Sequence, residues 1–107
     1  QFVRIGKYAM IGGMSGVEKD IIPYGLYTGI REELKGINIV GLKRKGCNSS
    51  AINEISFIIK KIFSKKDTIH NNIKNLDPNN IKIEEVNEIL KFINKNTKRG
   101  LCSLQNE

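Results

Sequence analysis

The chain has few of the residues that usually mark catalytic or metal sites. Its 107 residues include one histidine, two cysteines and no tryptophan, and Cys47 and Cys102 fit no metal-ligand spacing. His70 stands beside asparagines without a serine or cysteine nucleophile pattern near it, which indicates a surface residue rather than a catalytic base. No P-loop, dinucleotide fingerprint or zinc spacing is present. We therefore predict neither a metal site nor a nicotinamide cofactor.

Long apolar runs are also missing. No stretch approaches the roughly eighteen apolar residues that a membrane helix needs, and no charged-then-apolar signal segment opens the chain. Two incidental thiols favour a reduced, cytoplasmic setting, and we expect no membrane insertion. The first residue is Gln1 rather than methionine, and we interpret the chain as the C-terminal part of a longer protein.

A short hexapeptide repeat stands near the start of the chain. Ile5, Ile11 and Val17 lie six positions apart, and the first two are followed by Gly6 and Gly12. Such a period predicts one coil of a β-helix, in which the aliphatic residue points into the core and glycine or another small residue turns the corner. One coil cannot bury its own apolar face, because repeat folds need several stacked units. We therefore expect missing layers and an apolar end that associates.

The middle of the chain, residues 23–46, is rich in glycine, which breaks any long helix. Pro23 is expected to end the coil, since proline cannot donate to a sheet ladder. The run Ile37–Val40 predicts an extended crossing segment, and Gly41–Gly46 predicts a basic turn or helix start that can approach a phosphate. We expect domains at residues 1–28 (coil), 29–46 (connecting segment) and 47–107 (helices).

The third part predicts three amphipathic helices that pack as a small bundle. Asn48 or Ser49 can cap the first helix, and Asp67-Thr68 can start the second. Residues 77–80 predict a turn. Glu84 and Glu85 are favourably placed in the first turn of the third helix, and Gly100 is expected to end it. The apolar stripes of the three helices contain Ile52, Ile55, Ile59, Ile62 and Phe63, then Ile69, Ile73 and Leu76, then Val86, Ile89, Leu90 and Ile93.

Positive charge is concentrated in one stretch. The formal net charge of +7 divides into +1 for residues 1–28, +6 for residues 29–66 and zero for residues 67–107. This predicts an acidic partner, which could be a phosphate, a nucleic acid or an acidic protein. A solvated lysine surface is the simpler interpretation of the Lys60-Lys61 and Lys65-Lys66 pairs. Aromatic residues are not interleaved with the basic cluster, which argues against nucleic-acid binding.

The chain resembles the acyl-[acyl-carrier-protein]–UDP-N-acetylglucosamine O-acyltransferases. The resemblance rests on Gln1–Gly6, Met10–Val17, Asp20–Tyr24, Asn38–Gly46 and Thr97–Leu101, in that order. It implies the last coil of a left-handed parallel β-helix, followed by helices, in a homotrimer. It also implies transfer of an (R)-3-hydroxyacyl chain from acyl carrier protein to the 3-hydroxyl of UDP-N-acetylglucosamine, the first step of lipid A synthesis, without metal or nicotinamide.

The resemblance also assigns residues. It implies that the catalytic histidine and the oxyanion glycine lie upstream of Gln1, so the chain alone should be inactive. Gln1 matches a residue of the active-site groove, and Met10 and Gly13 match positions that set acyl-chain length. The residues that contact uridine and diphosphate in the family correspond to Asn38, Arg44 and Lys45. The chain departs from the family pattern at Ile30 and Arg31, at Val40, and at Lys45, where arginine is usual.

Two other interpretations stay open. One is another hexapeptide acyl- or acetyltransferase that uses coenzyme A. The other is a noncatalytic module, either a nucleic-acid binder or a trimerisation piece.

Overall fold

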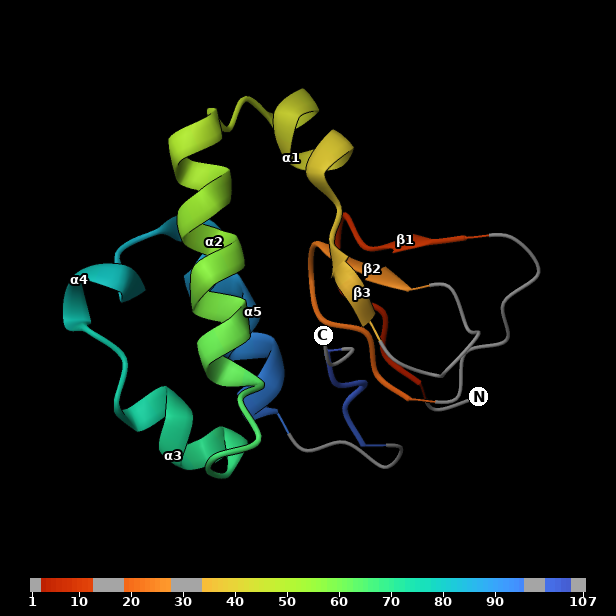
Figure 1. The fold of residues 1–107 in the computed structure, drawn as a ribbon. Coiled ribbons are helices and arrows are strands. Elements are labelled where there is room, and N and C mark those ends of the chain that lie inside the picture. Colours follow the sequence, from red (N-terminus) through yellow and green to blue (C-terminus); the bar gives the residue numbers. More distant parts are fainter. Residues whose placement is uncertain (1–2, 13–18, 28–33, 96–99, 105–107) are drawn as a thin grey trace.

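The computed structural model describes residues 3–12, 19–27, 34–95 and 100–104. Figure 1 shows the strands on one side of the molecule, most helices on the other, and α1 above the sheet. The elements are β1 (Met10–Ile11), β2 (Gly25–Tyr27), β3 (Leu34–Ile37), α1 (Ile39–Lys45), α2 (Ser49–Ile62), α3 (Ile69–Lys74), α4 (Pro78–Ile81) and α5 (Glu84–Asn94). None of the helices in these described ranges is long and apolar enough to cross a bilayer.

Two layers of the chain stack in parallel. Ile5 bridges Ile21, and Met10 of β1 lies opposite Leu26 of β2, so that each partner is sixteen positions further along. The hexapeptide repeat predicts this parallel stacking of successive coils, but sixteen residues separate the partners rather than the eighteen of three hexapeptides. The prediction that Pro23 ends the coil is wrong, because β2 follows it and continues the parallel pairing. The ladder bond from the Tyr24 N–H to the Lys7 carbonyl follows at once, so the missing N–H of Pro23 interrupts little.

In the described part of the coil, tyrosines rather than glycines have the left-handed conformation at the corners. Tyr8 has a φ of 59° and Tyr24 a φ of 65°, and their rings stack with centroids 5.6 Å apart and planes 6° from parallel. The expectation that glycine or another small residue turns the corner is therefore wrong at the corner after Gly6, where Tyr8 has the left-handed conformation. Gly6 is needed for a different reason, because a Cβ there would lie 2.3 Å from the Pro23 nitrogen of the next layer.

The aliphatic positions of the repeat are not equally buried. Ile5 is 51% exposed, against the expectation of a core position, and Ile11 is partly buried against the core. Ile5 belongs to the outer of the two described layers, so it is covered on one side by Ile21, which is fully buried. Val17 lies outside the described residues.

The end of the chain returns to the coil. β3 runs antiparallel to β2, and Leu104 bridges Leu34 of β3 in parallel. Leu101 bridges Asp20 in the same sense, which buries Cys102 completely. Gly100 does not end the last helix as predicted, since α5 ends at Asn94 and Gly100 opens this returning tail with a φ of 79°.

The extended segment expected for residues 37–40 is right only at Ile37, the last residue of β3, because α1 begins at Ile39 and includes the helix start that was one of the two alternatives for Gly41–Gly46. Asn38 caps the helix by accepting a hydrogen bond of 3.0 Å from the Gly41 N–H, and Leu42 is fully buried. The last turn of α1 contains Lys43, Arg44 and Lys45, and positive charge interacts favourably with the helix dipole at this end. Gly46 ends the helix in a left-handed conformation, with a φ of 108°.

We expect Gly41→Ala to destabilise the protein. An added Cβ would lie 2.4 Å from the Asn38 Nδ2, which displaces a capping side chain that is only 8% exposed. Losing the cap and orphaning its amide should outweigh the gain in helix propensity and lower the free energy of unfolding by about 1–2 kcal/mol. Denaturation of the double variant Asn38→Ala/Gly41→Ala is the control. The Gly41 change should cost little there, and an equal cost in both backgrounds would contradict the explanation.

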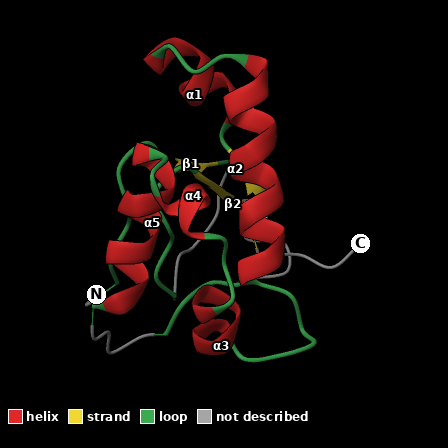
Figure 2. Cartoon of the chain, turned by 90° about the vertical axis from the view of Figure 1, so that its left-hand side faces the viewer, coloured by secondary structure: helices red, strands yellow, loops and turns green. Residues whose placement is uncertain are grey.

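The helices follow the apolar pattern closely. The side chain of Asn48 caps α2 and that of Thr68 caps α3, as predicted. α2 packs against both α3 and α5, and Figure 2 shows these helices around a shared interior. The turn expected at residues 77–80 is wrong, because residues 78–81 form the short helix α4. The buried core residues of α2 and α5 are Ile52, Ile55, Ile58, Ile59, Ile62, Val86, Ile89 and Leu90.

Candidate functional site

The basic end of α1 is the main charged feature of the connecting segment. Arg44 is exposed and, among the residues that the structure describes, makes no hydrogen bond or ion pair. Ile39 and Val40 in the first turn of the same helix are also about half exposed, at 48% and 52%. An unpaired guanidinium beside apolar surface can bind a phosphate through two parallel hydrogen bonds.

Lys45, one residue further, is held within the protein. Its Nζ lies 2.6 Å from the Oε2 of Glu85 and 3.7 Å from the Oε2 of Glu84, both in the first turn of α5. It also lies 6.0 Å from the centre of the Tyr24 ring. The hydrogen bond to Glu85 raises the pKa of Lys45 well above its ordinary value, so the ammonium stays charged.

Glu85 is the buried member of this pair. Its residue is 8% exposed, and it also accepts a long hydrogen bond of 3.6 Å from the Cys47 thiol. Burial raises the pKa of the Glu85 carboxyl, but the hydrogen bond and charge of Lys45 outweigh it, so the pKa lies below the ordinary value. Burial, with the Glu85 charge, raises the pKa of the Cys47 thiol, which keeps it protonated.

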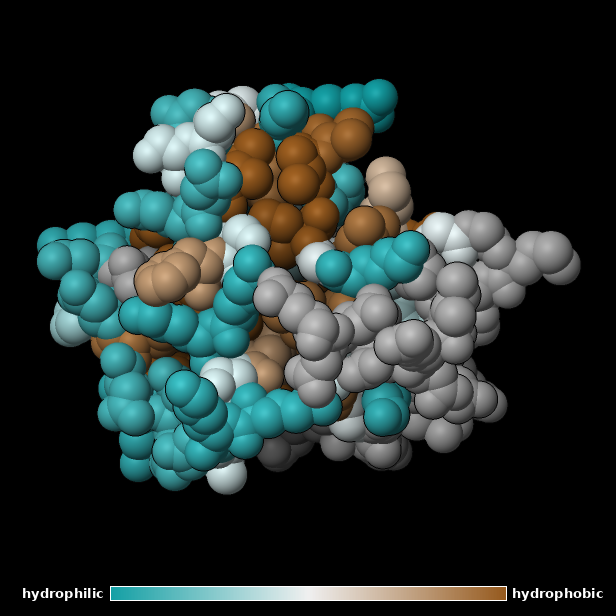
Figure 3. Space-filling view, viewed as in Figure 1, coloured by the Kyte–Doolittle hydropathy of each residue, from teal (hydrophilic) through white to brown (hydrophobic). Residues whose placement is uncertain are grey.

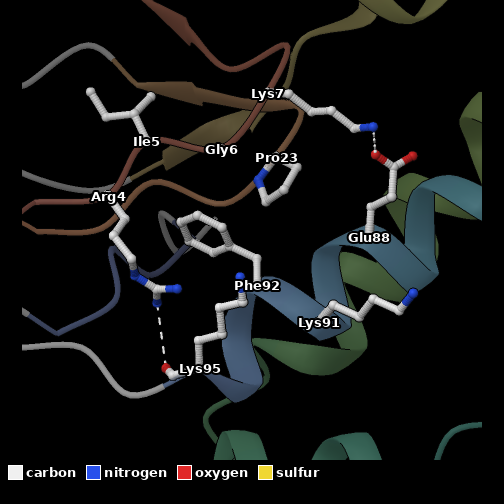
Figure 4. A pocket seen from close by; sticks show the side chains of 9 residues that line it. All are labelled: Arg4, Ile5, Gly6, Lys7, Pro23, Glu88, Lys91, Phe92 and Lys95. Atoms are coloured by element: carbon white, nitrogen blue, oxygen red, sulfur yellow. Dashed lines mark hydrogen bonds and ion pairs between the residues drawn. The ribbon is translucent and has the colours of Figure 1, made fainter.

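A second group of contacts ties the corner of the coil to α5. Figure 4 shows Lys7 reaching Glu88, and the other carboxylate oxygen of Glu88 accepts a hydrogen bond of 2.9 Å from the buried Tyr24 hydroxyl. Arg4 lies nearby with its guanidinium carbon 4.3 Å from the centre of the Phe92 ring. A hollow of about 430 Å³ opens between these side chains.

Arg4 is anchored on the other side by Asp20. Its backbone N–H and its Nε donate hydrogen bonds of 2.8 and 2.9 Å to the two carboxylate oxygens of Asp20, which is fully buried. A buried carboxylate needs such partners, because an unpaired charge in the interior is costly. Asp20 also bridges Leu101 of the returning tail, so it joins the coil to the tail, while Arg4 reaches Phe92 of α5.

The other predicted site residues divide into three groups. Asn38 is engaged internally, because its Nδ2 donates to the Tyr8 carbonyl at 2.9 Å while its Oδ1 caps α1. Met10 is 42% exposed on β1, so its side chain is available at the surface. Gln1 and Gly13, together with the departures at Ile30 and Arg31, lie outside the described residues.

A basic, partly apolar surface follows α2. Figure 3 shows apolar side chains gathered between α2 and α1, with hydrophilic residues around them. A hollow of about 340 Å³ lies there, between β3 and α2, with Lys35 and Lys60 in its wall. Phe57 of α2 is 57% exposed, and the Nζ of Lys61 lies 4.6 Å from the centre of its ring.

Sequence reasoning placed Glu84 and Glu85 correctly in the first turn of the last helix, but it missed that Glu85 is buried. A signal was available, because Glu85 precedes Val86 and lies four positions before Ile89 on the apolar stripe. A carboxylate on such a stripe needs a buried cationic partner. That the partner is Lys45, forty positions away, could not be read from the spacing.

The fold defines a stacked-coil protein with an appended helical segment. Its parts are the parallel layers, the basic end of α1 and the helices that follow. A family profile described as UDP N-acetylglucosamine O-acyltransferase, domain 2, matches residues 20–102. The chain belongs to this family, which confirms the resemblance of the sequence.

Individual relatives agree with the family. An acyl-[acyl-carrier-protein]–UDP-N-acetylglucosamine O-acyltransferase from Agrobacterium fabrum is 38% identical over 104 residues, which are 96% of this chain and 38% of the relative. Among solved structures, the Arabidopsis UDP-N-acetylglucosamine acyltransferase superposes with a TM-score of 0.83 at 31% identity, over 96% of this chain and 39% of that one. The UDP-N-acetylglucosamine acyltransferase from Campylobacter jejuni superposes with a TM-score of 0.80 at 33% identity, over 98% of this chain and 40% of that one. The chain thus spans about 38% of the length of the curated relatives it matches.

Proposed function

We propose that the protein containing this chain transfers an (R)-3-hydroxyacyl group from acyl carrier protein to the 3-hydroxyl of UDP-N-acetylglucosamine, in lipid A biosynthesis in the cytoplasm. Family membership supports the reaction, and the relatives carry both substrates in their names. The two parallel layers support placing this chain at the end of a left-handed β-helix, followed by a helical bundle. The homotrimer is proposed from the family resemblance. The reaction needs no metal or nicotinamide, and its catalytic histidine lies in another part of the protein.

The observation that carries the proposal is the exposure of the Arg44 side chain. Its guanidinium is exposed and unpaired among the described residues, while its neighbour Lys45 is held by carboxylates. A free guanidinium at a fixed helix end is suited to the diphosphate of a sugar nucleotide, because it can donate two parallel hydrogen bonds. Asn38 contributes by capping the same helix.

The second anionic partner of the basic stretch, besides the diphosphate, is acyl carrier protein. Lys61 and Phe57 on the outer face of α2 offer positive charge beside exposed apolar surface, which suits a docked acidic protein. This assigns the charge concentrated in residues 29–66 to two anionic ligands, the diphosphate at α1 and the carrier protein at α2.

The direct test is a transfer assay with the full-length protein. We expect transfer of a 3-hydroxyacyl group from acyl carrier protein to UDP-N-acetylglucosamine, with little transfer from the same acyl group on coenzyme A. Preference for the coenzyme A donor would support a different hexapeptide acyltransferase. Binding of random oligonucleotides that weakens with salt, without any transfer, would support a noncatalytic nucleic-acid module.

Acyl-chain length is assigned to Met10 and Gly13. We expect Gly13→Met in the full-length protein to shift donor preference toward shorter 3-hydroxyacyl chains, because a large side chain would fill the end of the groove. Competition between donors of different length measures this. Met10→Leu, which keeps the size of an exposed apolar side chain, is the matched control and should change preference less. Unchanged preference in Gly13→Met would show that Gly13 only shapes the coil.

A further inference from the structure

α1 is too short to hold its own shape. It has seven residues, and isolated helices of this length are unstable in water. Three contacts hold it: the Asn38 cap at its start, the buried Leu42 in its middle, and the Lys45 ion pair at its end. The last of these is an ion pair with a different helix, since Glu85 belongs to α5.

The surroundings of Lys45 are unsuitable for a diphosphate. Two carboxylates, Glu85 at 2.6 Å and Glu84 at 3.7 Å, face its ammonium, so the local charge of the three groups is negative. The face of the Tyr24 ring lies on another side, 6.0 Å away. An anion that approached Lys45 would have to displace one carboxylate and would be repelled by the other.

Arg44 faces a different environment. Consecutive side chains of an α-helix diverge by about 100°, so fixing Lys45 on α5 directs Arg44 away from it. Arg44 is exposed, and no carboxylate pairs with it among the described residues. The two neighbours therefore have separate roles, although the family pattern makes both of them nucleotide contacts.

We propose that Glu85 and Lys45 are positioning residues, which fix the end of α1 against α5 so that Arg44 is presented to the diphosphate. This inference rests on the proposed function, because it assumes that Arg44 binds the sugar nucleotide. Lys45 itself does not contact the ligand.

Neutral variants of the full-length enzyme test this assignment through KM and kcat and through direct binding of UDP-N-acetylglucosamine. Lys45→Gln and Glu85→Gln should each raise KM about three- to ten-fold with little change in kcat, because both break the same ion pair and misplace Arg44. The double variant should be no worse than either single variant. Lys45→Arg, which keeps the pair, should stay near wild type.

Two further variants make the test specific. Glu84→Gln is the matched control, since Glu84 is mostly exposed and more distant from Lys45, and it should leave KM unchanged. In an Arg44→Ala background, Glu85→Gln should have no additional effect on KM.

Three results would overturn the inference. If Lys45→Gln raises KM while Glu85→Gln leaves it unchanged or lowers it, Lys45 is a direct ligand. If both variants lower only the melting temperature and leave KM unchanged, the pair is merely structural. If the wild-type enzyme binds no sugar nucleotide, or Arg44→Ala binds it as tightly as wild type, the proposed role of the α1 end fails, and with it the role of the pair.

Discussion

Arg44→Ala in the full-length enzyme should raise the KM for UDP-N-acetylglucosamine by roughly one to two powers of ten. A charge-assisted hydrogen bond to a phosphate contributes roughly 1.5–3 kcal/mol, and this corresponds to that range of KM. Arg44 has no partner of its own in the described part of the chain, so its removal breaks no internal contact. The change in KM should therefore report the lost contact with the ligand. Steady-state kinetics with varied sugar nucleotide measures the change.

The KM for the acyl donor should change much less in this variant, because the acyl chain is expected at Met10 and Gly13 rather than at α1. Lys43→Ala is the matched control, since Lys43 is an exposed cation in the same turn. Its effect should be small, because a lysine offers a point charge without a bidentate fork. If Arg44→Ala instead weakens binding of acyl carrier protein and leaves the sugar nucleotide unaffected, the end of α1 is a protein-docking surface.

The largest effect on stability is expected from Gly6→Ala. An added Cβ would lie 2.3 Å from the Pro23 nitrogen and 2.6 Å from its Cα, and both are backbone atoms of the next layer. Because neither atom can rotate away, the two layers must separate. We expect a loss of about 3 kcal/mol in the free energy of unfolding, at the upper end of overpacking costs. Chemical denaturation measures it.

Gly25→Ala is the graded control for this change. Its added Cβ would meet Leu34 Cδ2 at 3.1 Å and the Ile22 carbonyl oxygen at 3.2 Å, and both contacts are relieved by small shifts, unlike those of Gly6. The cost should therefore be roughly 1 kcal/mol or less. Equal losses of unfolding free energy in the two variants would show that the close approach of Gly6 to Pro23 is not what makes Gly6→Ala destabilising.

Local sequence signals predicted the helices well. Isoleucines at helical spacing identified the buried face of α2, and Asn48 and Thr68 cap the helices that they were expected to cap. These predictions succeed because a helix is closed by contacts within a few residues, and the periodicity records which face is buried. The errors at residues 77–80 and at Gly100 concern boundaries, where proline and glycine permit more than one conformation.

The roles of the candidate site residues stay predictions, and the sequence anticipated only part of their surroundings. Arg44 could be selected from the basic segment and the family resemblance, and the structure leaves it exposed. Lys45 looked equivalent in the sequence, and only the position of Glu85 on α5 separates the two residues. The tyrosine corners were missed as well, because left-handed conformation favours glycine, and the stacking of Tyr8 on Tyr24 depends on both layers being in place.

The sequence by itself determined the family, the parallel layering of the coil and the apolar faces of the helices, since each is encoded by neighbouring or regularly spaced residues. Tertiary structure alone decided which charges are satisfied. Lys45 meets Glu85 across forty positions, Arg4 meets Asp20 in the next layer, and Leu101 returns to that same aspartate. Burial makes these pairings necessary, because a carboxylate withdrawn from water must have a partner, and that partner is supplied by whichever cation the folded chain places beside it.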